Sequence, residues 1–154
     1  MALRSPWLIH AVEPGKQLSD TWRGSPYDLS VYGPNGFVRH FKGTSSASAT
    51  ALNIVSKYGT SGSGSITSKI TNVTSAQLEV TVLDAYTGNS VTQALGPGET
   101  FANELSLEKF FGWYDLIVTV ARHPSFNYRL AGHVETGSDS FSDPALGGLV
   151  SLQG

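Results

Sequence analysis

His133 and Glu135 have the spacing of a metal-binding pair. They stand two positions apart in a segment rich in β-forming residues, so both side chains fall on one face of the expected strand. A zinc site needs at least a third protein ligand, and the sequence offers none nearby. We therefore interpret the two residues as an ordinary pair on a half-exposed strand, and we expect no bound metal and no cofactor.

Carboxylates continue along the next segment, where Glu135, Asp139 and Asp143 could supply oxygen ligands. Calcium takes roughly six to eight oxygen ligands, and the spacing does not match an EF-hand loop. Asp139 also suits a local turn, and Asp143 precedes Pro144, before which extended backbone is favoured. The sequence supports either interpretation, so calcium binding at this segment stays open.

Serine is plentiful, yet no serine stands in the G-x-S-x-G pattern of a nucleophile elbow. Gly62-Ser63-Gly64 belongs to a flexible loop that lacks the strand-to-helix context of such a nucleophile. The chain has no cysteine, which excludes thiol nucleophiles, thiolate metal sites and disulfides. We expect no catalytic residue in this chain.

Four aromatic residues, Phe110, Phe111, Trp113 and Tyr114, gather at the start of an expected strand. Trp113 and Tyr114 are neighbours in that strand, so their side chains fall on opposite faces and one of them points outward or into an interface. Exposed aromatic rings can contact lipid headgroups or another domain. These four residues are the candidate contact surface, and packing inside the core is the other interpretation.

The composition limits what else the chain can do. It has 154 residues and a net charge of -2, so a surface that tracks nucleic-acid phosphates is not expected. No apolar run approaches the roughly 20 residues of a membrane-spanning helix, and we expect neither such a helix nor a signal peptide within these residues. About a third of the residues are Gly, Ser or Thr, which is typical of a β-rich domain with many turns.

The sequence predicts that short strands position these residues. Alternation is clearest at Leu78, Val80 and Val82, which fall on one face of a strand. Strands are expected at 51–58, 65–72, 77–84, 91–95, 113–121 and 126–135, with a short helical turn within 103–111 that Asn103 could cap. The sequence predicts an all-β, antiparallel Ig-like β-sandwich. Its expected core is Leu52, Ile54, Ile66, Ile70, Leu78, Val80, Val82, Leu116, Val118, Phe126 and Leu130.

A further β-hairpin is expected at 27–43. Gly33-Pro34-Asn35-Gly36 suits a type I turn with proline in the second position, and Gly36 is expected to take a positive φ. A two-stranded hairpin is marginally stable by itself in water. We therefore predict that this hairpin docks against residues 51–135, on the same chain or on a neighbouring chain by swapping.

The two predicted hairpins resemble each other. Tyr27-Asp28-Leu29 recurs as Tyr114-Asp115-Leu116, and Pro14-Gly15 recurs as Pro97-Gly98. Phe37 and Gly43 likewise match Phe126 and Gly132. We interpret 1–43 as the second half of a truncated first repeat, 44–50 as a linker, 51–137 as a complete repeat and 138–154 as a C-terminal tail, in a chain that is a fragment of a longer protein.

The stretch from Tyr27 to Arg39, with its Gly-Pro-Asn-Gly-Phe centre, closely resembles the C-terminal domains of bacterial phosphocholine-preferring phospholipases C. Further similar stretches are 18–22, 112–116, 131–137 and 142–145. The resemblance implies an N-terminal catalytic domain of the acid-phosphatase-like type followed by two copies of this small domain. It also implies export, a secreted or periplasmic location, and release of phosphocholine from phosphatidylcholine or sphingomyelin.

On this resemblance, the chain is a non-catalytic accessory domain of an exported phospholipase C. Its expected partners are the catalytic domain of the same polypeptide, on which it would dock, and the phospholipid surface, to which it would help present the enzyme. An Ig-like binding or adhesion module, for example for carbohydrate, is the alternative. A self-sufficient enzyme is the third possibility, and it lacks a recognisable catalytic motif.

Overall fold

The computed structural model of the chain describes residues 15–17, 19, 24–44, 52–59, 64–137, 139 and 141–144. Residues 45–50 of the predicted linker, and most of 1–23 and 138–154, lie outside the described residues. The described strands are β1 (Tyr27–Tyr32), β2 (Val38–Gly43), β3 (Leu52–Tyr58), β4 (Ser65–Asn72), β5 (Leu78–Asp84), β6 (Ser90–Leu95), β7 (Thr100–Ser106), β8 (Trp113–Val120) and β9 (Asn127–His133). One 3-10 helix, η2 (Glu108–Phe110), lies between β7 and β8.

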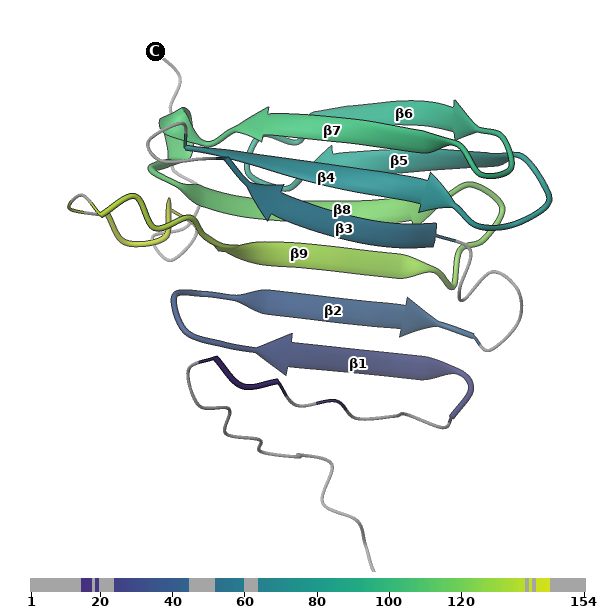
Figure 1. Cartoon of the computed structure of the whole chain (residues 1–154), viewed down its shortest axis with the longest axis horizontal. Coiled ribbons are helices and arrows are strands. Elements are labelled where there is room, and N and C mark those ends of the chain that lie inside the picture. Colours follow the sequence, from purple (N-terminus) through teal and green to yellow (C-terminus); the bar gives the residue numbers. More distant parts are fainter. Residues whose placement is uncertain are drawn as a thin grey trace, which may run out of the picture.

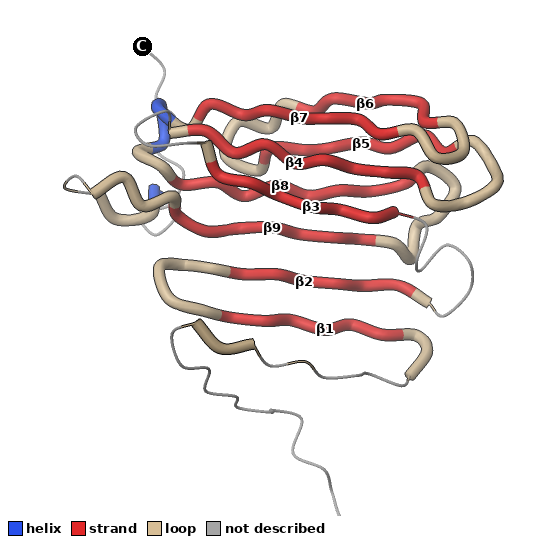
Figure 2. The backbone as a smooth tube through the Cα atoms, viewed as in Figure 1, coloured by secondary structure: helices blue, strands red, loops and turns tan. Residues whose placement is uncertain are grey.

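The strands form two antiparallel sheets. The larger has the order β1-β2-β9-β8-β5-β6, and the smaller has the order β3-β4-β7. Figure 1 shows the small sheet lying over the half of the large sheet that contains β6, β5 and β8, with β2 and β1 extending the large sheet beyond it. The same arrangement is visible in Figure 2, where strand and loop account for nearly the whole described chain. The predicted all-β sandwich is confirmed.

The core lies between the inner faces of the two sheets. Successive side chains of a strand point to opposite faces, and every second residue of β5 and β8 is buried in this core. The fully buried apolar side chains include Ile66, Ile70, Val80, Leu107, Tyr114, Leu116, Val118 and Leu130. Leu52 and Ile54, which were expected in the core, are only partly buried because β3 lies at the edge of the small sheet.

The predicted short helical turn within 103–111 is present as η2, Glu108–Phe110, but Asn103 does not cap it. Thr100–Ser106 is a strand that pairs with β4, from Ser65 opposite Ser106 to Thr71 opposite Thr100. Asn103 therefore lies within β7 and caps nothing, and η2 begins after Leu107 without a side-chain cap. The long edge of β4 was available for pairing, and that tertiary contact outweighs the weak local preference.

The turn of the first hairpin also differs from the prediction. The backbone N–H of Phe37 donates to the carbonyl of Pro34 at 3.1 Å, so Asn35 and Gly36 are the two central residues. Both have a positive φ, 55° and 66°, as in a type I′ turn. The expected positive φ of Gly36 is confirmed, but Pro34 occupies the first position of the turn instead of the second.

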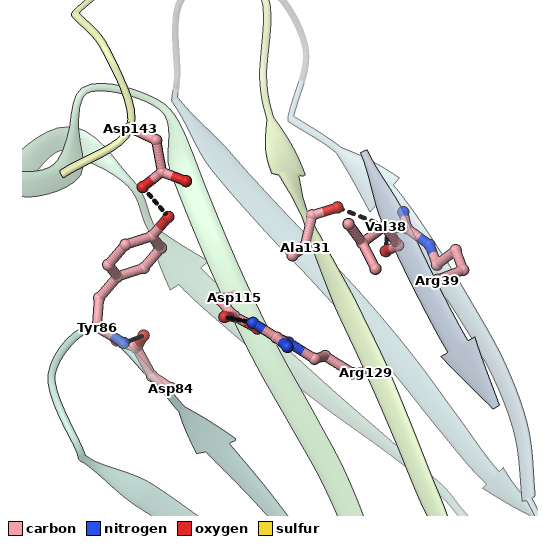
Figure 3. Close-up of polar contacts among 8 residues, drawn as sticks. All are labelled: Val38, Arg39, Asp84, Tyr86, Asp115, Arg129, Ala131 and Asp143. Carbon is pink, nitrogen blue, oxygen red and sulfur yellow. Dashed lines mark hydrogen bonds and ion pairs between the residues drawn. The ribbon is translucent and has the colours of Figure 1, made fainter. Parts of the chain in front are cut away.

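The first hairpin docks on the complete sandwich, as predicted, and it does so within the same chain. Strand β2 pairs antiparallel with β9 from Val38 opposite Ala131 to Lys42 opposite Asn127. Arg39 reinforces this junction, since its Nη1 donates to the Ala131 carbonyl at 3.1 Å (Figure 3). Its Nη2 donates to the buried Tyr114 hydroxyl at 3.2 Å. The docked hairpin converts a four-stranded sheet into a six-stranded one.

Candidate functional site

Phe110, Phe111, Trp113, His133 and Phe141 gather at one end of the sandwich, which we call the aromatic end. The short helix η2 positions the first two of them after β7. Its tight geometry is closed by two hydrogen bonds to the Leu107 carbonyl, from the N–H groups of Phe110 at 3.0 Å and Gly112 at 3.1 Å. Phe111 and Gly112 then both adopt positive φ, 53° and 89°. This sharp reversal starts β8 and turns the Phe111 ring away from the core.

Phe110 packs inward at the border of this end. Its ring stacks on Tyr86 with centroids 5.1 Å apart. The Tyr86 hydroxyl donates to Asp143 Oδ1 at 2.7 Å, which ties the segment after β9 to the turn after β5 (Figure 3). Burial and the hydrogen bond to Asp143 raise the pKa of Tyr86 well above its ordinary value of 10. Tyr86 therefore stays protonated and serves as a structural donor.

Phe111 and Phe141 form the exposed part of the aromatic end. Their ring centroids are 4.4 Å apart, and the two side chains keep 51% and 63% of their surface accessible. Paired aromatic rings that remain in water are costly for a free domain and typical of a contact surface. This pair is the strongest candidate for contact with a partner.

Trp113 packs behind the exposed pair, on the side toward the core. Its indole Nε1 donates to the Phe141 carbonyl at 2.8 Å, and its ring lies 4.8 Å from that of His133. The first hairpin also reaches this point, because a Cβ atom on Gly36 would lie only 2.6 Å from the Trp113 ring. Trp113 thus links the hairpin turn to the aromatic end, and any side chain at Gly36 would have to displace one of them.

The structure divides the four aromatic residues that the sequence proposed as a contact surface. Tyr114 has no accessible surface and belongs to the core, where its hydroxyl lies 2.9 Å from that of Tyr58. Phe110 and Trp113 are partly buried. Only Phe111 presents a largely exposed ring, and Phe141 joins it. We expect any contact to be made by Phe111 and Phe141 with Trp113 behind them.

His133 and Glu135 do lie together, with Nδ1 and Oε1 3.4 Å apart. Each also has a structural partner: His133 Nε2 donates to the Phe111 carbonyl at 2.9 Å, and Asn35 Nδ2 donates to Glu135 Oε1 at 2.6 Å. Within the described part of the chain, no three His, Asp or Glu residues are grouped as a metal site requires. Glu135, Asp139 and Asp143 are therefore not gathered around one point.

Sequence reasoning missed Phe141 and the hairpin turn as parts of this end. Phe141 stands in a Gly- and Ser-rich segment without periodicity, so no pattern indicates that its ring packs on Phe111. The Asn35 contact to Glu135 joins residues 100 positions apart, and only the docked hairpin brings them together. An Asn-Gly pair is the usual signal for a type I′ turn and could have located this loop.

The described residues contain no helix long and apolar enough to cross a membrane. The sequence pattern of the family described as "Bacterial phospholipase C, C-terminal domain" matches residues 3–44 and 47–133. These two segments cover most of the chain, and they meet close to the predicted linker.

Three curated relatives are similar to the chain. One is the non-hemolytic phospholipase C of Burkholderia pseudomallei, 40% identical over 94% of this chain. Two from Pseudomonas aeruginosa, a hemolytic and a non-hemolytic phospholipase C, are 38% and 30% identical over 78% and 93% of it. The alignments cover 21%, 17% and 22% of these relatives, so the chain spans about a fifth of their length. The chain belongs to the family of bacterial phospholipase C C-terminal domains.

Proposed function

We propose that this domain is a non-catalytic accessory part of an exported phospholipase C, and that its aromatic end contacts the phospholipid surface. The parent enzyme would hydrolyse phosphatidylcholine or sphingomyelin to release phosphocholine, with its catalytic groups in another domain of the same polypeptide. Family membership and the small share of each relative that the chain spans support the accessory role. The location would be secreted or periplasmic.

The exposed pair of Phe111 and Phe141 is the observation that carries the lipid contact. Aromatic rings are favoured at the boundary between water and lipid, and Trp113 beneath the pair adds an amphipathic ring with its N–H already bonded. Burying a whole phenylalanine side chain contributes about 1.5–3 kcal/mol. Two half-exposed rings can therefore supply enough free energy for a weak, reversible contact that assists a larger enzyme.

The charges around this end indicate which lipid surface it would meet. Glu135 and Asp139 are exposed in the segment that leads to Phe141, and Asp143 follows it, while Glu108 and Lys109 of η2 carry opposite charges. Carboxylates are repelled by anionic headgroups, whereas a zwitterionic surface carries no net charge. The domain is therefore expected to prefer vesicles of phosphatidylcholine to vesicles that also contain anionic lipid.

Vesicle binding tests the proposal. We expect the chain to co-sediment with phosphatidylcholine vesicles, and the double variant Phe111→Ser with Phe141→Ser to bind about tenfold more weakly, a loss of about 1.4 kcal/mol. Val73→Ser is the matched control, because Val73 is 56% exposed and follows β4 at the opposite end of the sandwich. It should bind as the unaltered chain does.

The contrary outcomes are equally definite. Absence of vesicle binding, or an equal loss with Val73→Ser, would contradict the lipid contact. If the double variant instead weakened binding of the chain to the separately prepared catalytic domain, the aromatic end would be a docking surface within the enzyme. Circular dichroism and urea unfolding of each variant would exclude a loss of folded protein as the cause.

A further inference from the structure

The two hairpins share detailed contacts as well as sequence. In β1–β2, a Cβ atom on Gly43 would lie 2.5 Å from the Tyr27 hydroxyl, and in β8–β9 one on Gly132 would lie 2.8 Å from the Tyr114 hydroxyl. Each tyrosine lies opposite its glycine in the strand register. The same cross-strand packing therefore occurs twice, which identifies β1 with β8 and β2 with β9.

The following residue of each first strand repeats a second contact. Asp28 of β1 pairs with His40 of β2, and Asp115 of β8 pairs with Arg129 of β9. In both hairpins the carboxylate reaches diagonally across to a basic residue on the same face. His40 and Arg129 consequently occupy equivalent positions in the two copies.

The junction between the hairpins has a local two-fold axis. Strands β2 and β9 run antiparallel, and the equivalent residues His40 and Arg129 lie directly opposite each other. Equivalent residues that face each other in an antiparallel pair place the two-fold axis between them, as in the interface of a symmetric dimer. The first hairpin is thus related to the second by a rotation that would relate two whole copies of the domain.

The rotation shows what the first hairpin lacks within the described chain. Val31 is 51% exposed, whereas its equivalent Val118 is fully buried beneath the small sheet. Strand β8 pairs with β5 on its outer side, with Val82 opposite Val118. Among the described strands β1 pairs only with β2. In the complete copy the small sheet covers the equivalent apolar face, and β5 pairs with the equivalent strand edge. Among the described residues, the apolar face of the first hairpin and the outer edge of β1 have no such cover.

A cavity of about 210 Å³ marks the same deficit between the hairpin and the small sheet. It lies where β3, the edge strand of the small sheet, passes the hairpin. Its lining comes from both copies. Tyr27, Phe41, Leu52, Ile54, Phe126 and Tyr128 supply apolar and aromatic surface, and Lys42 and Asn127 add polar groups. The two-fold axis would bring a second β3-like strand to this place.

We propose that β1 and the inner face of the first hairpin are the docking site for a β3-, β4- and β5-like segment of a preceding copy of this domain. The β5-like strand pairs with the outer edge of β1, so that the large sheet runs without a break through both copies. The expected register follows from the complete copy, where Leu83 lies opposite Ile117. Because Ser30 is the equivalent of Ile117, the residue equivalent to Leu83 should lie opposite Ser30.

A fusion within this sequence tests the register directly. A duplicate of residues 51–89 is joined ahead of Trp7, the position that matches residue 90 by the spacing between Pro14 and Pro97. Ser30→Cys is combined with Leu83→Cys in the duplicate, in a chain that has no other cysteine. Residues directly opposite in a sheet have Cα atoms about 4.5–5.5 Å apart, within reach of a disulfide. We expect mild oxidation to form this disulfide in most molecules.

The control moves one cysteine by two positions. Thr81→Cys in the duplicate, combined with Ser30→Cys, places the second thiol on the same face but at a diagonal, where disulfide formation should fall at least about tenfold. Equal formation in both registers, or none in a folded fusion, would overturn the proposal. If the fusion does not fold, a peptide of residues 77–89 that carries either cysteine is instead oxidised together with the Ser30→Cys variant of the chain. Equal disulfide formation by the two peptides would again overturn the proposal.

A second whole chain is the competing occupant. Dimers of the 154-residue chain at micromolar concentration, with slowed amide exchange in 27–32, would show that β1 pairs with β1 of another copy and would contradict the proposal. We expect a monomer by analytical ultracentrifugation. We also expect amides of 27–32 to exchange at least about tenfold faster than those of 114–120, until the fused segment is present.

Discussion

The hairpins β1–β2 and β8–β9 have the same tyrosine, aspartate and leucine in the same places, but the second is covered by a sheet and the first is not. Leu116 and Val118 are buried in the complete copy, while Leu29 is half-buried and Val31 is half exposed. The sequence motif therefore determines the hairpin and its cross-strand contacts. The strands that pack on it determine how much each residue stabilises the fold.

The comparison also shows how the uncovered hairpin is kept in place. It cannot be stabilised by its apolar face alone, so the backbone pairing of β2 with β9 and the polar contacts of Arg39 hold it. The Arg39 guanidinium also lies 4.2 Å from the centroid of the Phe37 ring. These contacts reach into the complete copy, so the hairpin depends on that copy for order.

Removing the leucine of each motif should give the largest difference. Leu116→Ala is expected to lower the free energy of unfolding by about 3 kcal/mol, because Leu116 is 1% exposed and its removal leaves a cavity. Leu29→Ala should cost about 1 kcal/mol or less, since water already reaches this side chain. Urea unfolding of the two variants measures the difference, and equal losses would show that the first hairpin is covered as fully as the second.

Adding a methyl group beneath each tyrosine should give the next largest difference. Gly132→Ala forces a Cβ atom against the buried Tyr114 hydroxyl, and overpacking of this kind costs about 1–3 kcal/mol. Gly43→Ala makes a contact that is at least as close, but the half-buried Tyr27 ring can move outward. We expect thermal unfolding to show a drop of several degrees for the first variant and little change for the second.

The Tyr114 hydroxyl should give a smaller, pH-dependent effect. Burial, together with the hydrogen bond to Tyr58, raises the pKa of Tyr114 to about 12, although the hydrogen bond to Arg39 opposes this. A raised pKa in the folded state means that the contribution to stability is complete below pH 10 and is lost as the pH rises toward 12. Stability of the unaltered chain should therefore fall over this interval.

Tyr114→Phe tests that assignment. It removes the hydroxyl contacts to Arg39 and Tyr58, so we expect a cost of about 1 kcal/mol at neutral pH. Its stability should also fall less steeply between pH 10 and 12 than that of the unaltered chain. Tyr128→Phe is a useful comparison, because burial also raises the pKa of Tyr128, whereas a hydrogen bond to Tyr58 does not contribute to that shift. An unchanged slope in the Tyr114→Phe variant would mean that another group dominates the alkaline loss.

Strands with their own periodicity could be predicted from the sequence, and elements that depend on distant partners could not. Leu78, Val80 and Val82 alternate clearly, and β5 was located to within one residue. Strand β7 was missed because only Phe101 and Leu105 mark its inner face and Asn103 stands between them. Its state is decided by the edge of β4, which local preference does not reveal.

The candidate site shows the same limit. Phe111 was identified from the aromatic cluster, but its partner Phe141 stands in a segment without a pattern. Tyr114 was grouped with the contact surface because it is next to Trp113, although strand alternation already required one of the two to point inward. The role of Arg39 depends on the docking of the hairpin, so only the assembled sheet shows that it bonds to Tyr114.

The smallest difference is expected at the diagonal ion pairs. Asp115 is 14% exposed and accepts two hydrogen bonds from Arg129, whereas Asp28 is 58% exposed beside His40 and Lys42. Arg129→Gln should therefore cost about 0.5–1 kcal/mol at neutral pH, since one partner is shielded from water. His40→Gln, at the equivalent position, should leave stability unchanged within experimental error.

The pKa of the Asp28 carboxyl nevertheless shows whether its ion pair with His40 is formed. The hydrogen bond from His40 lowers the pKa of Asp28 below its ordinary value of 3.8, and the charges of His40 and Lys42 act in the same direction. Because the folded-state pKa is lowered, the pair contributes stability at pH values above the ordinary pKa of 3.8. That contribution is lost as the pH falls through the folded-state pKa. His40→Gln should raise the pKa of Asp28 toward 3.8, measured by carboxyl NMR, with Arg122→Gln as a control that touches neither residue. An unshifted Asp28 would mean that the solvated pair of the first hairpin does not persist, and that only the covered copy retains this contact of the motif.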